Sequence, residues 1–185
     1  MDPVTGCSSG IGFNLASYVS KTSNRVVATA RKLSALSSLP EGPNVLKLSL
    51  DVTSKASIDA ATKAALAKFG RLDVVVNNAG YGLYGDTEST TDEQARKQLD
   101  TNFWGAVDIT KEAMRIMREE NPKTGPQGGV VVQISSLGGR VGFPGGAFYH
   151  ASKFALEGFT EAVAKEVHPD WNSESTLSCN LLLFR

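Results

Sequence analysis

Apolar runs of strand length alternate with helical patterns along this chain of 185 residues. The run at residues 72–78 is nearly continuous in apolar residues, which is typical of a parallel strand covered on both faces. Alternation of this kind predicts a parallel sheet joined by right-handed crossovers, so we expect an α/β fold with a doubly wound sheet in three layers (αβα). Strands are expected at residues 25–30, 45–50, 72–78 and 129–135, and helices at residues 13–19, 33–39, 54–69, 92–119 and 149–168.

Length and composition limit the kind of protein. A chain of 185 residues builds one domain with a sizeable core and is too short for two of ordinary size. Nineteen basic residues balance nineteen acidic ones, so no net charge attracts nucleic acid or an anionic membrane. The apolar runs are far shorter than the roughly 18 residues of a membrane span, and the sequence begins without a secretory signal. Cys7, which we expect to pack inside, and the distant Cys179 indicate free thiols in a reducing compartment, so we expect a cytoplasmic protein.

A glycine-rich segment joins the first strand to the first helix. Gly6, Gly10 and Gly12 follow the pattern G-x-x-x-G-x-G. Glycines permit a tight turn and let backbone N–H groups approach a pyrophosphate, which the positive end of the following helix attracts. Ser8 and Ser9 add hydroxyls that can face phosphate or ribose. The segment predicts a dinucleotide site, and a glycine-rich turn without a ligand is the alternative.

The residue after the second strand bears on the choice of dinucleotide. An acidic side chain there would bind the ribose 2′-hydroxyl of NAD, but the chain has Arg31 followed by Lys32. A guanidinium forms bidentate hydrogen bonds with a phosphate, so Arg31 favours NADP(H), with NAD(H) as the alternative cofactor. A solvated surface arginine is the other interpretation. Asp51, after the third strand, is predicted either to accept a hydrogen bond from adenine or to cap a helix.

Asparagines mark two further candidate positions. Residues 77–80 (Asn-Asn-Ala-Gly) end the fourth strand, and ligands of open α/β sheets bind at the carboxyl ends of the strands. We expect this motif to hold the glycine-rich segment and to contact the cofactor through its backbone. Asn102 falls inside a predicted helix, where asparagine competes with the backbone, so we expect a local distortion there that can hold water.

Three side chains in the last third of the chain predict acid-base chemistry. Tyr149 and Lys153 are spaced i, i+4 on one helix face, and Ser136 precedes the tyrosine by thirteen residues. A nearby cation favours the phenolate and lowers a tyrosine pKa from about 10, so Tyr149 can act as a general acid or base, although such pairs also occur by chance. The Ser136 hydroxyl can hydrogen-bond a substrate carbonyl where charge develops. His150 and His168 have no metal-ligand partner at helical spacing, so we assign both to structure or surface and expect no metal site.

Taken in order, these motifs resemble those of the short-chain dehydrogenase/reductase family over about residues 4–170. The resemblance implies a Rossmann fold and hydride transfer between a nicotinamide and a carbonyl or secondary alcohol. Tyr149 would be the general acid/base and Ser136, rather than Ser135, would polarise the carbonyl. Lys153 would lower the phenol pKa and bind the nicotinamide ribose, and Asn102 would support a proton relay through water.

The same resemblance implies cofactor contacts and partners. The contacts would come from Gly6, Ser8, Ser9, Gly10, Ile11, Gly12, Arg31, Asp51, Val52, Asn78, Ala79, Gly80, Tyr149 and Lys153. The segment 26–31 (Val-Val-Ala-Thr-Ala-Arg) is similar to the carbonyl- and hydroxysteroid-reducing branch. The implied partner is a small-molecule carbonyl or alcohol, and helices at residues 92–119 and 149–168 would form the contacts of a homo-oligomer.

Both ends of the chain differ from the family pattern. The first strand keeps only residues 3–5, and Pro3 cannot donate to a ladder. The family's C-terminal strands, Pro-Gly turn and lid are not recognised, so we expect a single domain over residues 1–185 with an atypical tail at 172–185. Within that tail, residues 177–184 either pair as a short strand or stay disordered. A nucleotide-binding or partner-binding remnant without turnover is therefore the alternative to a reductase, and the absence of a second substrate domain disfavours a third option, sugar-nucleotide chemistry.

Overall fold

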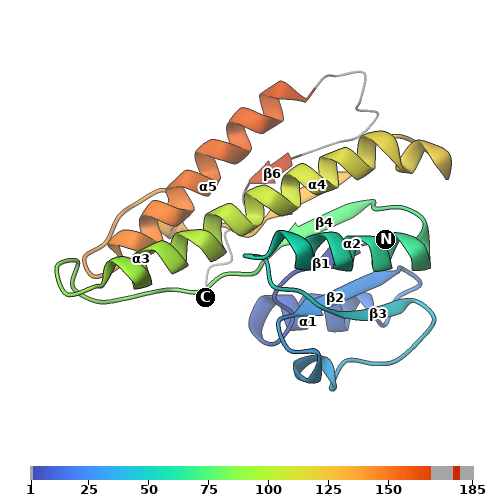
Figure 1. Cartoon of the computed structure of the whole chain (residues 1–185), viewed down its shortest axis with the longest axis horizontal. Coiled ribbons are helices and arrows are strands. Elements are labelled where there is room, and N and C mark those ends of the chain that lie inside the picture. The colour runs from blue at the N-terminus through green and yellow to red at the C-terminus, as the bar shows by residue number, and fades with distance from the viewer. Residues whose placement is uncertain (1, 168–176, 180–185) are drawn as a thin grey trace.

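The computed structural model describes residues 2–167 and 177–179, which form a parallel sheet with the strand order β3-β2-β1-β4-β5-β6 (Figure 1). The strands are β1 (Asp2–Val4), β2 (Val26–Ala30), β3 (Val45–Ser49), β4 (Val74–Asn77), β5 (Val130–Gln133) and β6 (Leu177–Cys179). The helices are α1 (Gly10–Val19), α2 (Lys55–Phe69), α3 (Asp92–Leu99), α4 (Gly105–Glu119) and α5 (Ala147–Glu166). Shorter turns are η1 (Leu33–Leu36), η2 (Asp100–Trp104), η3 (Asn121–Lys123) and η4 (Leu137–Gly139). The doubly wound parallel sheet is confirmed, and its order reverses between β1 and β4.

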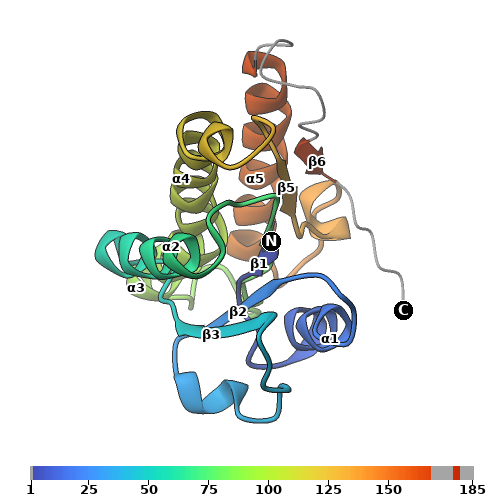
Figure 2. The same cartoon turned by 90° about the vertical axis from the view of Figure 1, so that its right-hand side faces the viewer.

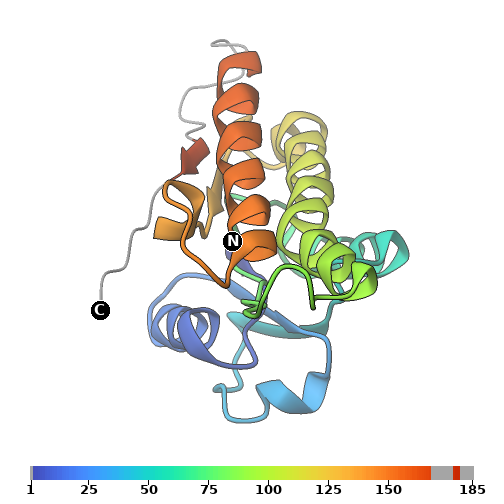
Figure 3. The ribbon, with the colours of Figure 1, turned by 90° about the vertical axis from the view of Figure 1, so that its left-hand side faces the viewer.

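Alternate residues of β2 face opposite layers of the molecule. Val26 and Ala28 pack in one buried cluster with Ala16 of α1, whereas Val27 packs in the other cluster with residues of α2 and α4. Since successive side chains of a strand point to opposite faces of the sheet, a continuous run of small and β-branched residues supplies apolar side chains to both buried layers. Helix α1 covers one face, and α2 and α4 cover the other, with α5 standing beside α4 (Figures 2 and 3).

The helix expected at residues 92–119 is interrupted by a π-helical turn. Thr91 caps α3, because its hydroxyl accepts a hydrogen bond from Gln94 N while the Gln94 side chain accepts one from Thr91 N. The turn η2 then separates α3 from α4 and contains Asn102. A π-turn inserts an extra residue per turn and shifts the helix faces on either side of it. The expected distortion at Asn102 is confirmed, whereas the helix expected at 33–39 is only the 3₁₀ turn η1.

Pro3 lies in β1, at the middle of the sheet. The N–H of Asp2 donates to Arg25 O beside β2, and the N–H of Thr5 donates to Val76 O on β4. Successive backbone N–H groups of a strand point to opposite neighbouring strands, so the nitrogen of Pro3 points toward β4. The ladder between β1 and β4 is short, with Val4 paired to Val76. The missing proline N–H thus lies on the side of β1 with the shorter ladder.

Strand β6 lies at the edge of the sheet next to β5. Its residues pair in parallel with Val131 to Gln133 of β5, so of the two alternatives for residues 177–184 a short strand is observed at Leu177–Cys179, where C-terminal strands were expected to be missing. The rest of the predicted tail and His168 lie outside the described residues. Within the described part, no helix is both long and apolar enough to cross a membrane.

Asn121 joins the segments that lead into β4 and β5. Its Oδ1 accepts a hydrogen bond from Leu72 N at 3.0 Å, and its Nδ2 donates to Leu72 O at 2.6 Å and to Gly128 O at 2.8 Å. The side chain is fully buried. One side-chain amide therefore supplies hydrogen-bond partners for backbone groups of these loops, which have no neighbouring strand to bond.

We expect Asn121→Ala to lower the free energy of unfolding by about 2–3 kcal/mol, because it leaves the backbone N–H and C=O of Leu72 buried without partners. Urea denaturation followed by circular dichroism measures this loss. Gln127→Ala is the control, since this exposed amide donates to Arg118 O at the surface, and it should change stability by less than about 0.5 kcal/mol. Similar losses in the two variants would contradict the role assigned to Asn121.

Candidate active site

The segment between β1 and α1 has a backbone that requires glycine. Gly6 (φ 70°) and Gly10 (φ 58°) are left-handed. A Cβ on Gly12 would lie 2.6 Å from Gly6 O and would also collide with Asn78 Nδ2. Glycine at position 12 therefore lets α1 start directly against the turn that precedes it.

Thr5 and Asn78 fasten this segment to the end of β4. Thr5 Oγ1 accepts hydrogen bonds from Asn78 N at 2.9 Å and Ala79 N at 2.8 Å. In return, Asn78 Nδ2 donates to Thr5 O at 2.8 Å and Gly6 O at 3.3 Å. The expected hold of residues 77–80 on the glycine-rich segment is seen in these bonds, while their contact with a cofactor stays a prediction. The Thr5 hydroxyl was missed as a site residue, although its place directly before Gly6 was a signal.

The N-terminus of α1 fits a phosphate group. Ser8, Ser9 and Gly10 are exposed, and no atom lies within 4 Å of the position that a Gly10 Cβ would take. The Ser9 side chain caps no N–H group of α1, and the first turn holds no acidic residue. Open backbone N–H groups at the positive end of a helix attract an anion. These observations fit the pyrophosphate of a dinucleotide, with Ile11 exposed beside it.

Arg31 and Asp51 follow neighbouring strands. Arg31 is exposed after β2. The pKa of Asp51 is lowered, first by a hydrogen bond from the Thr53 hydroxyl (2.7 Å), then by one from Thr53 N (3.0 Å), with the charge of Arg31 as a lesser cause. Asp51 closes the turn before α2, and because Ser54 is the residue that caps α2, the helix-cap interpretation of Asp51 is wrong.

Val52 is buried and packs against the start of α4 at Gly105. A Cβ on Gly105 would lie 2.7 Å from Val52 Cγ2, so the valine side chain occupies the space that this glycine leaves. A contact of Val52 with a cofactor, as the sequence predicts, would therefore come from its backbone.

Asn102 connects three segments. Its Oδ1 accepts from Tyr81 N at 3.0 Å, and its Nδ2 donates to Tyr81 O at 2.9 Å and Ser152 Oγ at 3.2 Å. The side chain is 1% exposed, so its amide is used inside the protein. Gln98, one turn earlier, accepts from Leu83 N at 2.8 Å and also donates to Tyr81 O. The fully buried Gln98 was missed by the sequence analysis, although its spacing of four residues from Asn102 was an available signal.

Lys153 and Asn102 both lie beside Gly80. The Lys153 Nζ donates to Ile134 O at 2.7 Å, and the residue is 7% exposed. A Cβ on Gly80 would lie 3.1 Å from Asn102 Oδ1 and 3.9 Å from Lys153 Nζ. Predicted site residues from the loop after β4, from η2 and from α5 thus lie close to one another.

Ser136 and Tyr149 meet at Gly138. The Ser136 Oγ accepts a hydrogen bond from Gly138 N at 3.1 Å, and a Cβ on Gly138 would lie 3.1 Å from Tyr149 Cε1. Both side chains are partly exposed. Ser135 turns inward instead, where its hydroxyl oxygen is buried next to Gly139.

The surface around Tyr149 is apolar and aromatic. The ring of Tyr84, which is 69% exposed, lies 5.7 Å from the Tyr149 ring between centroids. Phe143, on the loop that precedes α5, is 50% exposed. A hydrogen bond of 2.8 Å from Gly85 N to Gly145 O joins the loops that carry these two rings. The rim of the candidate site therefore offers apolar surface to a ligand.

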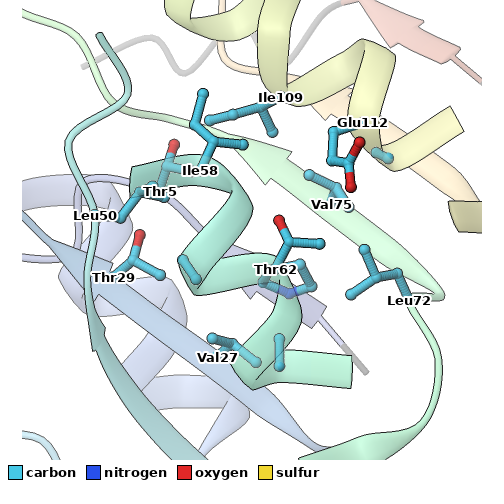
Figure 4. A pocket seen from close by; sticks show the side chains of 14 residues that line it. Thr5, Val27, Thr29, Leu50, Ile58, Thr62, Leu72, Val75, Ile109 and Glu112 are labelled. Carbon is cyan, nitrogen blue, oxygen red and sulfur yellow. The ribbon is translucent and has the colours of Figure 1, made fainter. Parts of the chain in front are cut away.

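A separate cavity of about 50 Å³ lies between the sheet, α2 and α4 (Figure 4). Its lining is mainly aliphatic, with polar atoms from Thr5, Thr29, Thr62 and Glu112. Neither Tyr149 nor Lys153 lines it, so it belongs to the packing of the core. Cys7 is fully buried, as expected, and burial raises the pKa of its thiol to about 11. Within residues 2–167 and 177–179 no cluster of three His, Cys, Asp or Glu side chains could hold a metal ion.

A doubly wound sheet with a glycine-rich turn at its point of reversal is the architecture of dinucleotide-binding proteins. The model of the short chain dehydrogenase family matches residues 3–171. The chain therefore belongs to the short-chain dehydrogenase family.

Several relatives share this sequence and structure. The oxidoreductase calM of Penicillium decumbens is 52% identical over 174 residues, which cover 91% of this chain and 56% of that protein. A 3-ketodihydrosphingosine reductase of Bacteroides thetaiotaomicron is 40% identical over 90% of this chain and 58% of its own length. Among solved structures, a short-chain dehydrogenase from Streptomyces avermitilis (TM-score 0.81, 38% identity) is matched over 91% of this chain and 61% of its own. A 3-ketoacyl-(acyl-carrier-protein) reductase from Brucella melitensis complexed with NADH (TM-score 0.83, 30% identity) is matched over 91% and 70%. The chain thus spans just over half the length of the curated relatives it matches.

We expect Gly12→Ala to lower the free energy of unfolding by about 1–3 kcal/mol, because the added methyl group meets backbone that cannot move away easily. Gly158→Ala is the matched control, since this glycine also lies in a helix and has no atom within 4 Å of a new Cβ. The control should gain up to about 1 kcal/mol from the better helix propensity of alanine. Chemical denaturation of both variants measures the difference, and a neutral Gly12→Ala would show that the close approach is not needed.

Proposed function

We propose that this chain is an NADP(H)-dependent oxidoreductase domain that transfers hydride between a nicotinamide and a carbonyl or secondary alcohol. The observation that supports it most is the convergence of predicted residues at one edge of the sheet. The side chains of Asn102 and Lys153 both lie beside Gly80, and Gly138 lies between Ser136 and Tyr149. Nicotinamide supplies the hydride when it is bound, and the side chains of the chain supply the proton and the polarity.

Tyr149 gives or takes the proton at the substrate oxygen. Lys153 lies one helical turn away, and its bond to Ile134 O fixes the ammonium near the end of β5. The Ser136 hydroxyl accepts from Gly138 and keeps its own proton, so it can donate to the carbonyl oxygen. Asn102 holds the loop at Tyr81 in place, and a role in a proton relay through water rests on the family resemblance.

The glycine-rich segment and α1 hold the pyrophosphate in this proposal. Ser8 and Ser9 are exposed there, and Arg31 is exposed after β2, where it can bind a 2′-phosphate. NAD(H) is the alternative cofactor, and the complex of the Brucella reductase with NADH supports it. The pairing of Arg31 with a 2′-phosphate is what favours NADP(H).

The rim favours an uncharged substrate with an apolar group. Tyr84 and Phe143 present aromatic surface beside Tyr149, and the loop of Tyr84 carries the acidic residues Asp86 and Glu88. Apolar surface with few polar groups is typical of small-molecule sites, and the acidic loop disfavours anionic carbonyl compounds. The names of the related reductases fit a carbonyl substrate. A place in the carbonyl- and hydroxysteroid-reducing branch, a homo-oligomer and a cytoplasmic location are further parts of this proposal.

We expect Tyr149→Phe to lower kcat by about 10²- to 10⁴-fold with a neutral ketone such as 4-phenylbutan-2-one, because the proton donor is lost. The loss of NADPH absorbance measures turnover, and titration of NADPH fluorescence should give a Kd within about threefold of the wild type. Tyr18→Phe, on an exposed ring of α1, is the control and should leave both values unchanged. Equal turnover by Tyr149→Phe and the wild type would overturn the mechanism, whereas NADPH binding without any wild-type turnover would support the nucleotide-binding alternative.

We expect Arg31→Ala to raise the Kd of NADPH by about 10- to 100-fold and to leave that of NADH nearly unchanged, because a charge-assisted contact to the 2′-phosphate is lost. Arg96→Ala on α3 is the control, since this arginine is also exposed but lies outside the predicted cofactor contacts. Calorimetric titration with both nucleotides measures the two constants. If NADPH binds Arg31→Ala as tightly as the wild type, Arg31 is a solvated surface residue.

A further inference from the structure

His150 fills the space between two glycines beside the candidate active site. The imidazole is 8% exposed and its Nδ1 lies 3.1 Å from Gly138 O. A Cβ on Gly138 would lie 2.5 Å from His150 Nδ1, and a Cβ on Gly146 would lie 2.7 Å from His150 Nε2. Alanine at either position would therefore collide with the ring, so the two glycines and the histidine fit one another.

The imidazole connects to the Ser136 hydroxyl through Gly138. Because a carbonyl oxygen only accepts, we assign the ring proton to Nδ1, which donates to Gly138 O. The N–H of Gly138 donates to Ser136 Oγ at 3.1 Å. Gly138 is thus held at its C=O by His150 and holds the serine oxygen with its N–H.

The same ring also contacts the two aromatic residues of the site. The Tyr149 ring lies 5.7 Å from the imidazole, nearly edge-on, and the Phe143 ring lies 5.6 Å from it between centroids. His150 therefore touches the serine loop, the proposed acid/base residue and the apolar rim, which come from three different segments.

We propose that His150 is a positioning residue that fixes the hydroxyl of Ser136 relative to Tyr149. This inference rests on the proposed function, because it assigns to Ser136 the bond to the substrate carbonyl. The hydrogen bond from Nδ1 fixes the Gly138 backbone, and the ring volume holds the loop of Phe143. The effect on catalysis comes from the hydrogen bond, since it determines the direction in which the Gly138 N–H meets Ser136 Oγ.

Two substitutions of His150 separate its hydrogen bond from its volume. His150→Asn keeps an N–H donor near the place of Nδ1, and His150→Phe keeps a ring without a donor. With 4-phenylbutan-2-one and saturating NADPH, we expect kcat to fall about tenfold in His150→Phe and to stay within about threefold of the wild type in His150→Asn. The KM should change less than about twofold in both. Thr160→Val is the control, because it removes another buried hydrogen bond of α5 (Thr160 Oγ1 to Leu156 O, 2.7 Å) and should lower stability without lowering kcat.

Hydrogen exchange of the Gly138 amide, measured by NMR, tests the same inference without turnover. We expect exchange about tenfold faster in His150→Phe than in the wild type and in His150→Asn. Equal kcat in the Asn and Phe variants, a fall in Thr160→Val as large as in His150→Phe, or unchanged Gly138 exchange in His150→Phe would each overturn the inference. If the wild type reduces no carbonyl, that result counts against the proposed function, and the exchange rates alone decide whether His150 positions the serine loop.

Discussion

The hydrogen bonds between Thr5 and the end of β4 are the constraint on which the candidate site depends. One hydroxyl oxygen receives the N–H groups of Asn78 and Ala79, so the glycine-rich segment and the loop after β4 keep a fixed relation. The first segment presents the open N-terminus of α1, and the second places Gly80 against Asn102 and Lys153. The strand order reverses between β1 and β4, so the connections that leave these two neighbouring strands run toward opposite edges of the sheet. The hydrogen bonds of Thr5 join the two parts of the site at this point.

Buried and half-buried side-chain amides join several loops to the sheet or to a helix. Asn78, Gln98, Asn102 and Asn121 each bond backbone groups of a neighbouring segment. A loop has no ladder partner, so its buried N–H and C=O groups need side chains to pair with. An amide suits this task because it donates and accepts at once without a charge that burial would penalise. The site is therefore held by neutral polar groups, and Lys153 is the buried cation among its described residues.

The proposed acid-base residues lie on a helix, and the apolar rim beside them lies on loops. Tyr149 and Lys153 share the first turns of α5, while Ser136 leads into the short turn η4, which Gly138 and His150 join to that helix. The apolar rings of Tyr84 and Phe143 lie on loops that one backbone hydrogen bond connects. In the proposed function, separate segments thus set the proton transfer and the choice of substrate, which is how one fold serves many reactions.

The doubly wound sheet and the glycine-rich turn could be predicted from the sequence, because alternation of apolar runs and glycines at a strand-to-helix turn are local properties. It also indicated the distortion at Asn102, since asparagine is unfavourable inside a helix. Three features became visible in the fold alone: Asp51 closes a turn without capping α2, residues 177–179 pair beside β5, and Gln98 and His150 bond backbone groups next to the candidate site. These features depend on contacts between segments far apart in the chain. A residue's own position in the sequence does not reveal which backbone groups the fold leaves for it to pair with.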